Sequence, residues 1–516
     1  MQIFLIVIIF ILRIFFFIIL VSIFLLLIRN FRVTIVSIKI FNRRFFADLE
    51  LLLTVWNLLF LFIVLIIRRR VIIFSFSYIS GLKVVNFVLL YLRFVVRMLW
   101  LIVNNNFYWI MFGWDGLGVV SFLLIVFYIN YESINNGLST IFQNRVGDLF
   151  FVIFILGVCI ISLWTNLILV WGVFFLVIGR IVKRAQFPFN SWLLSAMRAP
   201  TPISSLVHSS TLVVAGVFIL LQFSYCLYDI FEVLKLISLL RLIIRFFGLV
   251  NERDMKKLIA YPTIRHVSLI IYLLRFQLFK IVYFHLNIHA IFKSLIFMCF
   301  GFAILSSFHS QDKRLVRLIN LNPFIKVIYY FSCLCLAGLP FLSGFFSKDL
   351  ILEKIIRVNI DFFYVVLLFI FLGVRIYYSV KLIKLFDIKY SQVIVEINYF
   401  RILSVIIIII VSILIINIFL RLVFRLSLEI ISFKIIIYLF IIVFFFFSVG
   451  TNINFKFISY DKIKRFQESL SVDFYLIDKY IYWNMFTIIQ IINQMSFIKI
   501  ILLVNWWIIL MFIIIV

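Results

Sequence analysis

The stretch that decides the fold runs from Lys183 to Leu220 and reads KRAQFPFNSWLLSAMRAPTPISSLVHSSTLVVAGVFIL. Most of it is apolar enough to lie in a membrane. One lysine, three prolines and one histidine interrupt it, namely Lys183, Pro188, Pro200, Pro202 and His208. Prolines remove backbone hydrogen bonds, and a charged or titratable side chain is costly at membrane depth. Interruptions of this kind are typical of membrane proteins that let water or ions pass, so we expect a polar path here.

Composition sets the fold class. Of the 516 residues, 66% are hydrophobic and only 13% are charged, which excludes a soluble globular domain of this length. Apolar runs of about 20 residues, the length that crosses a bilayer as a helix, follow one another along nearly the whole chain. The sequence therefore predicts an all-α polytopic membrane protein with about 13–15 transmembrane helices.

The charges and cysteines narrow the possible partners. The formal net charge is +28, from 48 basic and 20 acidic residues, but the basic residues occur in short clusters such as 68–70. Anchoring at the membrane surface and contact with anionic lipid explain such clusters better than nucleic acid does. The five cysteines show no CxxC spacing, which argues against zinc, haem or iron–sulfur sites. We expect no nucleic-acid partner, no metal and no redox centre on this chain.

The apolar runs divide the chain into three parts. N-terminal transmembrane helices are expected in 1–103, a core carrying the polar motifs in 104–370, and further transmembrane helices in 371–516. Within 473–496, polar and apolar residues mix as in an amphipathic helix that lies along a membrane or a partner. The expected spans are 3–28, 51–67, 84–103, 107–128, 149–164, 170–182, 211–223, 236–249, 267–278, 284–305, 325–337, 362–383, 402–424, 430–447 and a last one ending at Val516.

Two charged motifs precede the deciding stretch. Asp115 lies inside the apolar run FYWIMFGWDGLGVVSFLLIVFY, where a charge costs about 2.5–3.5 kcal/mol and therefore needs a partner or a cavity. Alternatively, Asp115 caps a helix, and the glycines around it let helices approach closely. Arg145 and Asp148 are three residues apart, so they share one helix face and can pair or line an entry path; by themselves they are weaker candidates.

Lys183 is a stronger candidate. Burial disfavours its charged form, whereas a nearby carboxylate such as Asp115 favours it, so a lysine in this position can gain and lose a proton near neutral pH. Pro188 follows within two helical turns and frees backbone carbonyls, which internal water can then satisfy. The sequence thus predicts both a proton carrier and a medium for proton transfer.

A histidine stripe extends this series. In FHLNIHAIFKSLIF, His285, His289 and Lys293 follow at intervals of four residues and therefore lie along one helix face. Histidine titrates near neutral pH, so this stripe and His208 can relay protons. Two alternatives are that each histidine is an ordinary buried polar residue, and that His285 and His289 bind a metal. The metal alternative lacks the glutamate of HExxH and a third ligand.

A third motif repeats the design of the first. In LAGLPFLSGFFSKDLILE, Pro340 and Gly344 interrupt a helix just ahead of Lys348 and Asp349. Two interrupted segments in corresponding positions are typical of transporters built from two related halves. Lys256, in NERDMKKLIAYPTIRH, stands at a helix start near a membrane edge. Solvated anchoring explains Lys256 as well as a functional role does.

These motifs carry a specific resemblance. GWDGLGVVSFLLIV, NRVGD, AQFPFNSWL followed by APTPISSLVHSSTLVVAGV, DMKKLIAY, FHLNIHAIFKSLIFM, HSQDKR and GLPFLSGFFSKDLILE occur in order between about 104 and 353. VDFYLIDKYI follows near the C-terminus. Together they resemble the NADH–ubiquinone oxidoreductase chain 5 family in its mitochondrially encoded form. That family is the distal, antiporter-like, proton-pumping subunit of respiratory complex I.

The resemblance implies a fold and a set of roles. The fold would be two inverted five-helix repeats, each with one discontinuous helix, and a C-terminal helix running laterally along the membrane arm before a last span. Asp115 would be the carboxylate partner of the central Lys183, and His208 a connecting histidine. The second-half relay and the terminal proton site would consist of His285, His289, Lys293, Lys348 and Asp349. Two departures stand out: Arg184 replaces a small residue, and Pro262, Arg265 and His266 alter a run that usually reads AYSTxSQ.

The resemblance also implies an assembly. The chain would be a subunit of the proton-translocating NADH:ubiquinone reductase in the mitochondrial inner membrane. It would carry no cofactor, because NADH, FMN, iron–sulfur clusters and ubiquinone belong to other subunits. Its partners would be other membrane-arm subunits, especially the neighbouring antiporter-like chain 4, and phospholipids such as cardiolipin. Two alternatives remain: an Mrp-type cation/proton antiporter subunit, and a purely structural membrane subunit with vestigial polar residues.

Overall fold

The structure is a computed structural model that describes part of the chain. The described residues are 34–38, 49–79, 83–161, 166–186, 189, 191–207, 211–224, 234, 238, 254–274, 276–307, 311, 319–320, 323–339, 342, 344–348, 350–351, 373, 376, 378–384 and 393–394. By its internal contacts the chain divides into two compact units, 1–449 and 450–516, and every described residue lies in the first. The expected spans at 3–28, 402–424 and 430–447, the last span and the amphipathic segment lie outside the described residues, as does 236–249 apart from Ser238.

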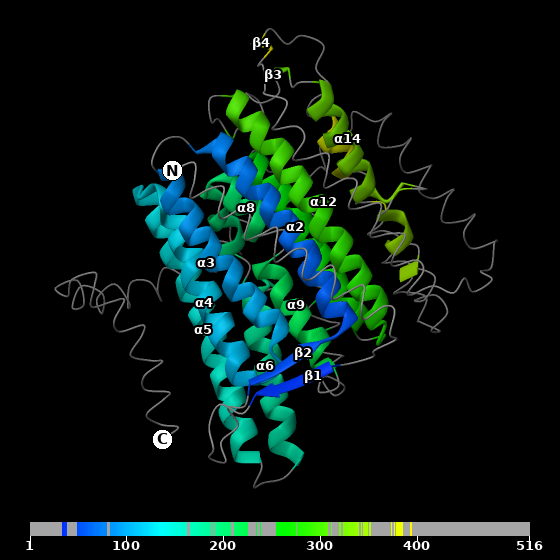
Figure 1. The fold of residues 1–516 in the computed structure, drawn as a ribbon. Helices are drawn as coiled ribbons and strands as arrows, with labels where there is room; N and C mark the ends of the chain where they lie inside the picture. The colour runs from blue at the N-terminus through cyan, green and yellow to red at the C-terminus, as the bar shows by residue number, and fades with distance from the viewer. Residues whose placement is uncertain are drawn as a thin grey trace, which may run out of the picture. The chain divides into compact units, whose positions relative to one another are not determined.

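Helices dominate the described residues, as predicted. Figure 1 shows α3, α4 and α5 side by side, with α12 next to α2. The long helices are α2 (Val55–Tyr78), α3 (Lys83–Val103), α4 (Phe107–Ile125), α5 (Tyr131–Ile161), α6 (Asn166–Lys183), α9 (Leu212–Gln222), α11 (Met255–Leu274), α12 (Phe279–Ser306) and α14 (Pro323–Ala337). The short ones are η1 (Val126–Tyr128), α7 (Ser191–Ser195), η2 (Ala196–Arg198) and α8 (Thr201–Val207).

Several of these helices can cross a membrane. Within the described residues, five segments are long and apolar enough: Lys83–Val103, Phe107–Tyr128, Tyr131–Ile155, Met255–Leu274 and Phe279–Ser306. The last two are buried almost all round, whereas the first three bury about half of their residues. α11 and α12 therefore form the interior of the described part, and α3, α4 and α5 keep a face for lipid or partners.

Two short ladders depart from the all-α prediction. β1 (Thr34–Ile38) pairs antiparallel with β2 (Leu49–Leu53), and β3 (Ile319–Asn320) pairs parallel with β4 (Val393–Ile394). The span expected from residue 51 was thus wrong at its start. Helix α2 begins only after Thr54, whose side chain accepts a hydrogen bond from the Asn57 N–H at 3.1 Å. A short leucine-rich run does not by itself distinguish strand from helix.

Two helices begin earlier than hydropathy predicted. α5 starts at Tyr131 instead of residue 149, and α11 starts at Met255 instead of residue 267. Their first turns are polar, so an apolar window misses them. In α11 these polar residues are nevertheless mostly buried, because the helix packs within the protein and lipid does not surround it.

α5 and α6 approach each other closely at two glycines. A Cβ atom added to Gly179 would lie 2.7 Å from the Gly147 carbonyl oxygen, and one added to Gly147 would lie 3.0 Å from the Gly179 carbonyl oxygen. Backbone therefore contacts backbone here, as at the small-residue interfaces of membrane helices. This contact brings the last turns of α6 against the part of α5 that carries Asp148.

We expect Gly179→Ala to weaken the assembled protein, because the added methyl group meets backbone, which cannot swing away as a side chain can. The matched control is Gly172→Ala on the same helix, where the nearest atom, in the Phe154 ring, is 3.8 Å from the new Cβ. Overpacking costs about 1–3 kcal/mol, so thermal unfolding of the purified assembly should occur at lower temperature for Gly179→Ala only. Equal melting of the two variants would contradict the proposed backbone contact.

Both predicted helix interruptions are present. α6 ends at Lys183, and Ala185 takes a left-handed conformation with φ of 52°. The Gln186 N–H then bonds the Ile181 carbonyl at 3.1 Å, which closes the helix end. In the second interruption, α14 ends at Ala337, Gly338 has φ of 79°, and helix resumes over 344–348. Pro188 and Pro340 lie outside the described residues.

Candidate functional site

Four charged side chains form a continuous chain across α4, α5 and α6. The Lys183 ammonium lies 2.9 Å from an Asp148 carboxylate oxygen, and Arg145 lies 3.5 Å from the other oxygen of Asp148. Arg145 also forms an ion pair with Asp115. Two acids and two bases make this group neutral overall, which is the condition for charges to be tolerated inside an apolar bundle.

Exposure is greatest at Arg145, the second member of this chain, and smallest at Lys183, its last member. The side chain of Arg145 is 36% exposed and that of Asp115 is 16% exposed, whereas Asp148 and Lys183 expose only 7% and 2%. Charge can therefore be exchanged with the outside near Arg145 and is shielded at Lys183. Because interactions strengthen as water is excluded, Lys183 depends on Asp148 far more than Asp115 depends on Arg145.

Trp114 contacts Lys183, the most buried of the four charged residues. The Lys183 ammonium donates to the Trp114 carbonyl at 2.8 Å and lies 4.2 Å from the centre of its indole ring. Gly118 leaves room, since a Cβ atom there would lie 3.8 Å from the ammonium nitrogen. A carbonyl, a ring face and one carboxylate thus surround the ammonium, and only the carboxylate carries a full opposite charge.

The structure changes the expected pairing of Lys183. The carboxylate in contact with Lys183 is Asp148, whereas Asp115 contacts Arg145. The physical reason is the close packing of α6 on α5 at Gly147 and Gly179, which places the residue after Gly147 beside the end of α6. The sequence held a signal for this arrangement: a glycine next to a charged residue inside a span.

A second group of polar residues surrounds α12. The His266 ring of α11 lies 3.4 Å from His285, nitrogen to nitrogen, and its centre is 5.0 Å from the centre of the His289 ring. The second ring nitrogen of His285 is 3.0 Å from the Ser347 hydroxyl oxygen. The histidine stripe is thus bridged from another helix and leads to the segment that carries Lys348.

The two lysines of this group are held by backbone carbonyls. Lys293 donates to the Ile259 carbonyl at 3.2 Å, and Lys348 donates to the Leu336 carbonyl at the end of α14. Both lysines lie within electrostatic range of His266 and His289. Asp349 and His208 lie outside the described residues, so their predicted roles stay predictions.

His266 is the residue that sequence reasoning missed. In the sequence it stood out only as one of the residues that alter the run AYSTxSQ of the resembled family. A histidine in the buried, apolar half of a helix was the available signal, but its contacts with His285 and His289 depend on how α11 packs on α12. In the described part of the chain, no three His, Cys, Asp or Glu side chains converge as metal ligands.

Several buried polar atoms around these groups have no hydrogen-bond partner within the described part of the chain. They include both ring nitrogens of His289, both amide atoms of Asn287 and of Gln186, and all three guanidinium nitrogens of Arg180. Arg180 instead lies over the rings of Trp114 and Phe151, at 5.4 and 4.9 Å. Buried polar atoms of this kind are usually satisfied by internal water, which supports a hydrated interior.

Lys256 lies apart from both groups. Its ammonium donates to the carbonyl of Ala199 at 2.9 Å, in the turn between η2 and α8. Lys256 therefore joins the start of α11 to the interrupted segment that follows Lys183. It has no carboxylate partner among the described residues, so this contact is not a simple surface anchor.

Comparison with known proteins places both groups inside one family region. The family described as NADH:quinone oxidoreductase/Mrp antiporter, transmembrane region, matches residues 104–373. The chain is 37% identical to NADH–ubiquinone oxidoreductase chain 5 of Locusta migratoria, over 63% of this chain and 59% of that relative. Identity with chain 5 of Anopheles arabiensis is 38%, over 60% and 84%. The alignments thus span about 59% of the length of the first curated relatives.

Solved structures show the same fold at low identity. An archaeal membrane-bound sulfane sulfur reductase, a respiratory membrane complex, gives a TM-score of 0.66 at 17% identity over 76% of this chain and 86% of that chain. The Mrp complex of a Dietzia species gives 0.65 at 18% identity over 87% and 55%. The family match covers more than half of the chain and contains both polar groups. The chain is therefore a multi-pass membrane protein of the NADH:quinone oxidoreductase/Mrp antiporter family and a homologue of NADH–ubiquinone oxidoreductase chain 5.

Proposed function

We propose that this chain is a proton-translocating membrane-arm subunit of respiratory complex I, NADH:ubiquinone oxidoreductase. It takes part in coupling NADH oxidation and quinone reduction to proton pumping and carries no redox centre itself. The observation that carries the proposal is the buried Lys183–Asp148 ion pair at the inner end of a charged chain that reaches the more exposed Arg145. The curated chain 5 relatives support the assembly.

The charged chain supplies a switch. Asp148 contacts both Arg145 and Lys183, so a shift of Asp148 toward Arg145 weakens its hold on the Lys183 ammonium. Desolvation then favours loss of the lysine proton. Moving one charge across the membrane works against about 2.3 kcal/mol per 100 mV, and breaking a buried ion pair costs an energy of at least that order, which is regained when the pair forms again.

The second group receives and passes protons. Neutral histidine both accepts and donates a proton through its two ring nitrogens. His285, His266 and His289 are arranged so that a proton can move between rings toward Lys293 and Lys348, with Asp349 and His208 in the family roles proposed for them. Lys256 lies apart from both groups and is the weaker candidate for a part in this path.

We also propose a helix arrangement and a location for the subunit. The core, 104–370, comprises two inverted five-helix repeats within a total of about 13–15 membrane helices, followed by a lateral C-terminal helix in 371–516. The subunit lies in the mitochondrial inner membrane beside the antiporter-like chain 4, in contact with cardiolipin-type phospholipid. NADH, FMN, iron–sulfur clusters and ubiquinone are held by other subunits.

Lys183→Ala tests the proposal. We expect the variant to assemble, because it removes a buried charge and leaves Asp148 paired with Arg145, but to lose proton pumping coupled to NADH oxidation. Assembly is followed on native gels and proton uptake with a pH-sensitive dye in reconstituted vesicles. Pumping at the unmodified rate in an assembled variant would refute the role of Lys183.

A second candidate is an Mrp-type cation/proton antiporter subunit. This candidate is supported by the description of the matching family, which names the Mrp antiporter, and by the likeness to the Mrp complex of the Dietzia species. Co-purification separates the two. An assembly that contains NADH dehydrogenase subunits supports the first candidate, and Na⁺-dependent proton flux without them supports the second.

A further inference from the structure

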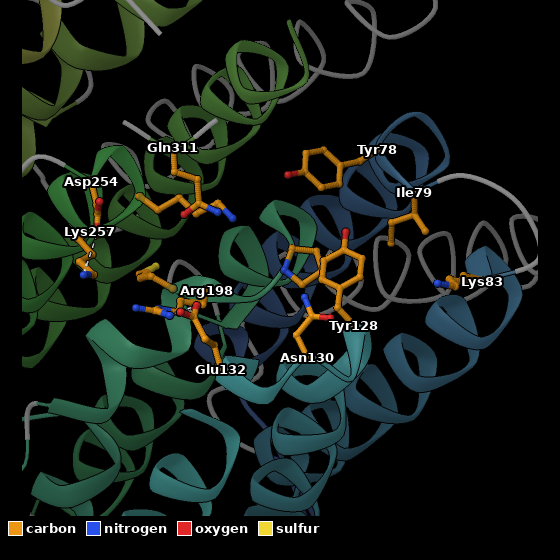
Figure 2. A pocket seen from close by; sticks show the side chains of 13 residues that line it. Tyr78, Ile79, Lys83, Tyr128, Asn130, Glu132, Arg198, Asp254, Lys257 and Gln311 are labelled. Atoms are coloured by element: carbon orange, nitrogen blue, oxygen red, sulfur yellow. Dashed lines mark hydrogen bonds and ion pairs between the residues drawn. The ribbon is translucent and has the colours of Figure 1, made fainter. Parts of the chain in front are cut away.

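A cavity of about 710 Å³ opens beside the ends of several membrane helices, apart from both groups described above (Figure 2). Its walls include Tyr78 at the end of α2, Lys83 at the start of α3, Tyr128 at the end of η1, and Lys256 at the start of α11. Lys83 and Tyr128 are the terminal residues of candidate membrane spans, and Lys256 is the second residue of another. The cavity therefore lies at one surface of the membrane, at the level of lipid headgroups.

The cavity carries a positive charge that its own acids do not neutralise. Among the described residues that line it, four are cations and two are carboxylates. Glu132 is paired with Arg198, and Asp254 is paired with Lys257 at 2.7 Å. Lys83 and Lys256 have no carboxylate partner among the described residues, so the described part of the lining has a formal net charge of +2 (four minus two).

Several other lining groups can donate hydrogen bonds. The buried Lys256 ammonium uses one of its three N–H groups on the Ala199 carbonyl, which leaves two for a ligand. The Tyr128 hydroxyl and the side-chain amides of Asn130 and Gln311 also line the cavity, beside the apolar side chains of Ile79, Met197 and Pro200. Donors and cations without a free carboxylate are the environment that a phosphate oxyanion requires.

An apolar turn lies at the edge of this cavity. Ile129, between the lining residues Tyr128 and Asn130, is 77% exposed, and Tyr131 is 81% exposed. A free inorganic phosphate would gain nothing from these side chains. The glycerol and acyl portions of a phospholipid would cover them, and tyrosine is favoured at the headgroup level of membranes.

We propose that this cavity is a binding site for the phosphate headgroup of an anionic phospholipid, whose acyl chains lie against Ile129 and Tyr131. The site recognises the phosphate through Lys83, Lys256 and Tyr128. The proposal does not depend on proton translocation, since it rests on the cavity, its charge and the exposed turn.

The test uses the assembled complex that contains this chain. The complex is reconstituted in phosphatidylcholine nanodiscs with a small fraction of phosphatidylglycerol bearing a photoreactive acyl chain, and labelled peptides are identified by mass spectrometry. We expect labelling of the peptide that contains 129–131. Lys83→Gln should reduce it about fivefold, the contribution of one lysine near an anionic lipid, and Tyr128→Phe should also reduce it.

The matched control is Lys280→Gln, which removes another exposed lysine from the first turn of a membrane helix, α12, outside the cavity lining. It should leave labelling unchanged. Three results would overturn the proposal: equal labelling by a phosphatidylcholine probe, displacement of the label by millimolar inorganic phosphate, or no labelling at 129–131 because a neighbouring subunit covers the turn. The second result would assign the cavity to a free oxyanion.

Discussion

Replacing Asp148 by asparagine is expected to destabilise the assembled protein severely and to abolish proton transport in whatever still assembles. The substitution leaves the Lys183 ammonium, 2% exposed, with a carbonyl and an indole ring but no opposite charge. Removing one partner of a buried ion pair costs about 3–5 kcal/mol. Yield on native gels and proton uptake per NADH oxidised measure the two effects separately.

Two further variants test whether the effect of Asp148→Asn comes from the loss of its ion pair with Lys183. Asp115→Asn is the matched control, because Asp115 pairs with the more exposed Arg145, and such a pair contributes only about 0–1 kcal/mol. The double variant Asp148→Asn with Lys183→Met removes both buried charges and should restore assembly without restoring transport. If the double variant assembles as poorly as Asp148→Asn alone, Asp148 does not act through Lys183.

Replacing His266 by glutamine is expected to slow proton transport by about 10²-fold, the lower range of what a positioned acid–base group contributes, while assembly is preserved. Glutamine keeps similar bulk and hydrogen-bonding capacity, but its amide does not titrate. His266 bridges two histidines that are one helical turn apart on α12, touching His285 at 3.4 Å and the His289 ring at 5.0 Å between centres. Without a titratable bridge, the relay is interrupted.

Ser268→Ala on the same helix is the control for His266→Gln. The Ser268 hydroxyl bonds the Arg265 carbonyl of its own helix at 2.7 Å, so its removal should change neither assembly nor transport. Proton uptake in reconstituted vesicles is the measurement, with NADH oxidation recorded in parallel. A His266→Gln variant that pumps as fast as Ser268→Ala would remove His266 from the path.

The sequence predicted those features of the site whose signals are local. Lys183 and Lys348 were predicted because each is a charge beside a helix interruption, and both interruptions are present in the structure. The spacing of His285, His289 and Lys293 likewise predicts one helix face without knowledge of neighbours.

Features set by packing between helices were not predictable in this way. Which aspartate contacts Lys183 depends on the approach of α6 to α5 at Gly147 and Gly179. The contacts of His266 depend on the packing of α11 against α12. The early starts of α5 and α11 were missed for a related reason. Their first turns are polar, so a prediction from hydropathy treats them as loops. In α11 these turns are nevertheless helical and surrounded by protein instead of lipid.

The contact at Gly147 and Gly179 has a kinetic consequence. Backbones already this close cannot be pressed further together. Asp148 can then change its cation partner by rotation of side chains alone, with α5 and α6 acting as a fixed frame. Rotamer changes of exposed side chains such as Arg145 take picoseconds to nanoseconds, whereas collective helix motions take microseconds to milliseconds. An exchange of partner at Asp148 that needs no movement of α5 against α6 avoids that slower, collective step.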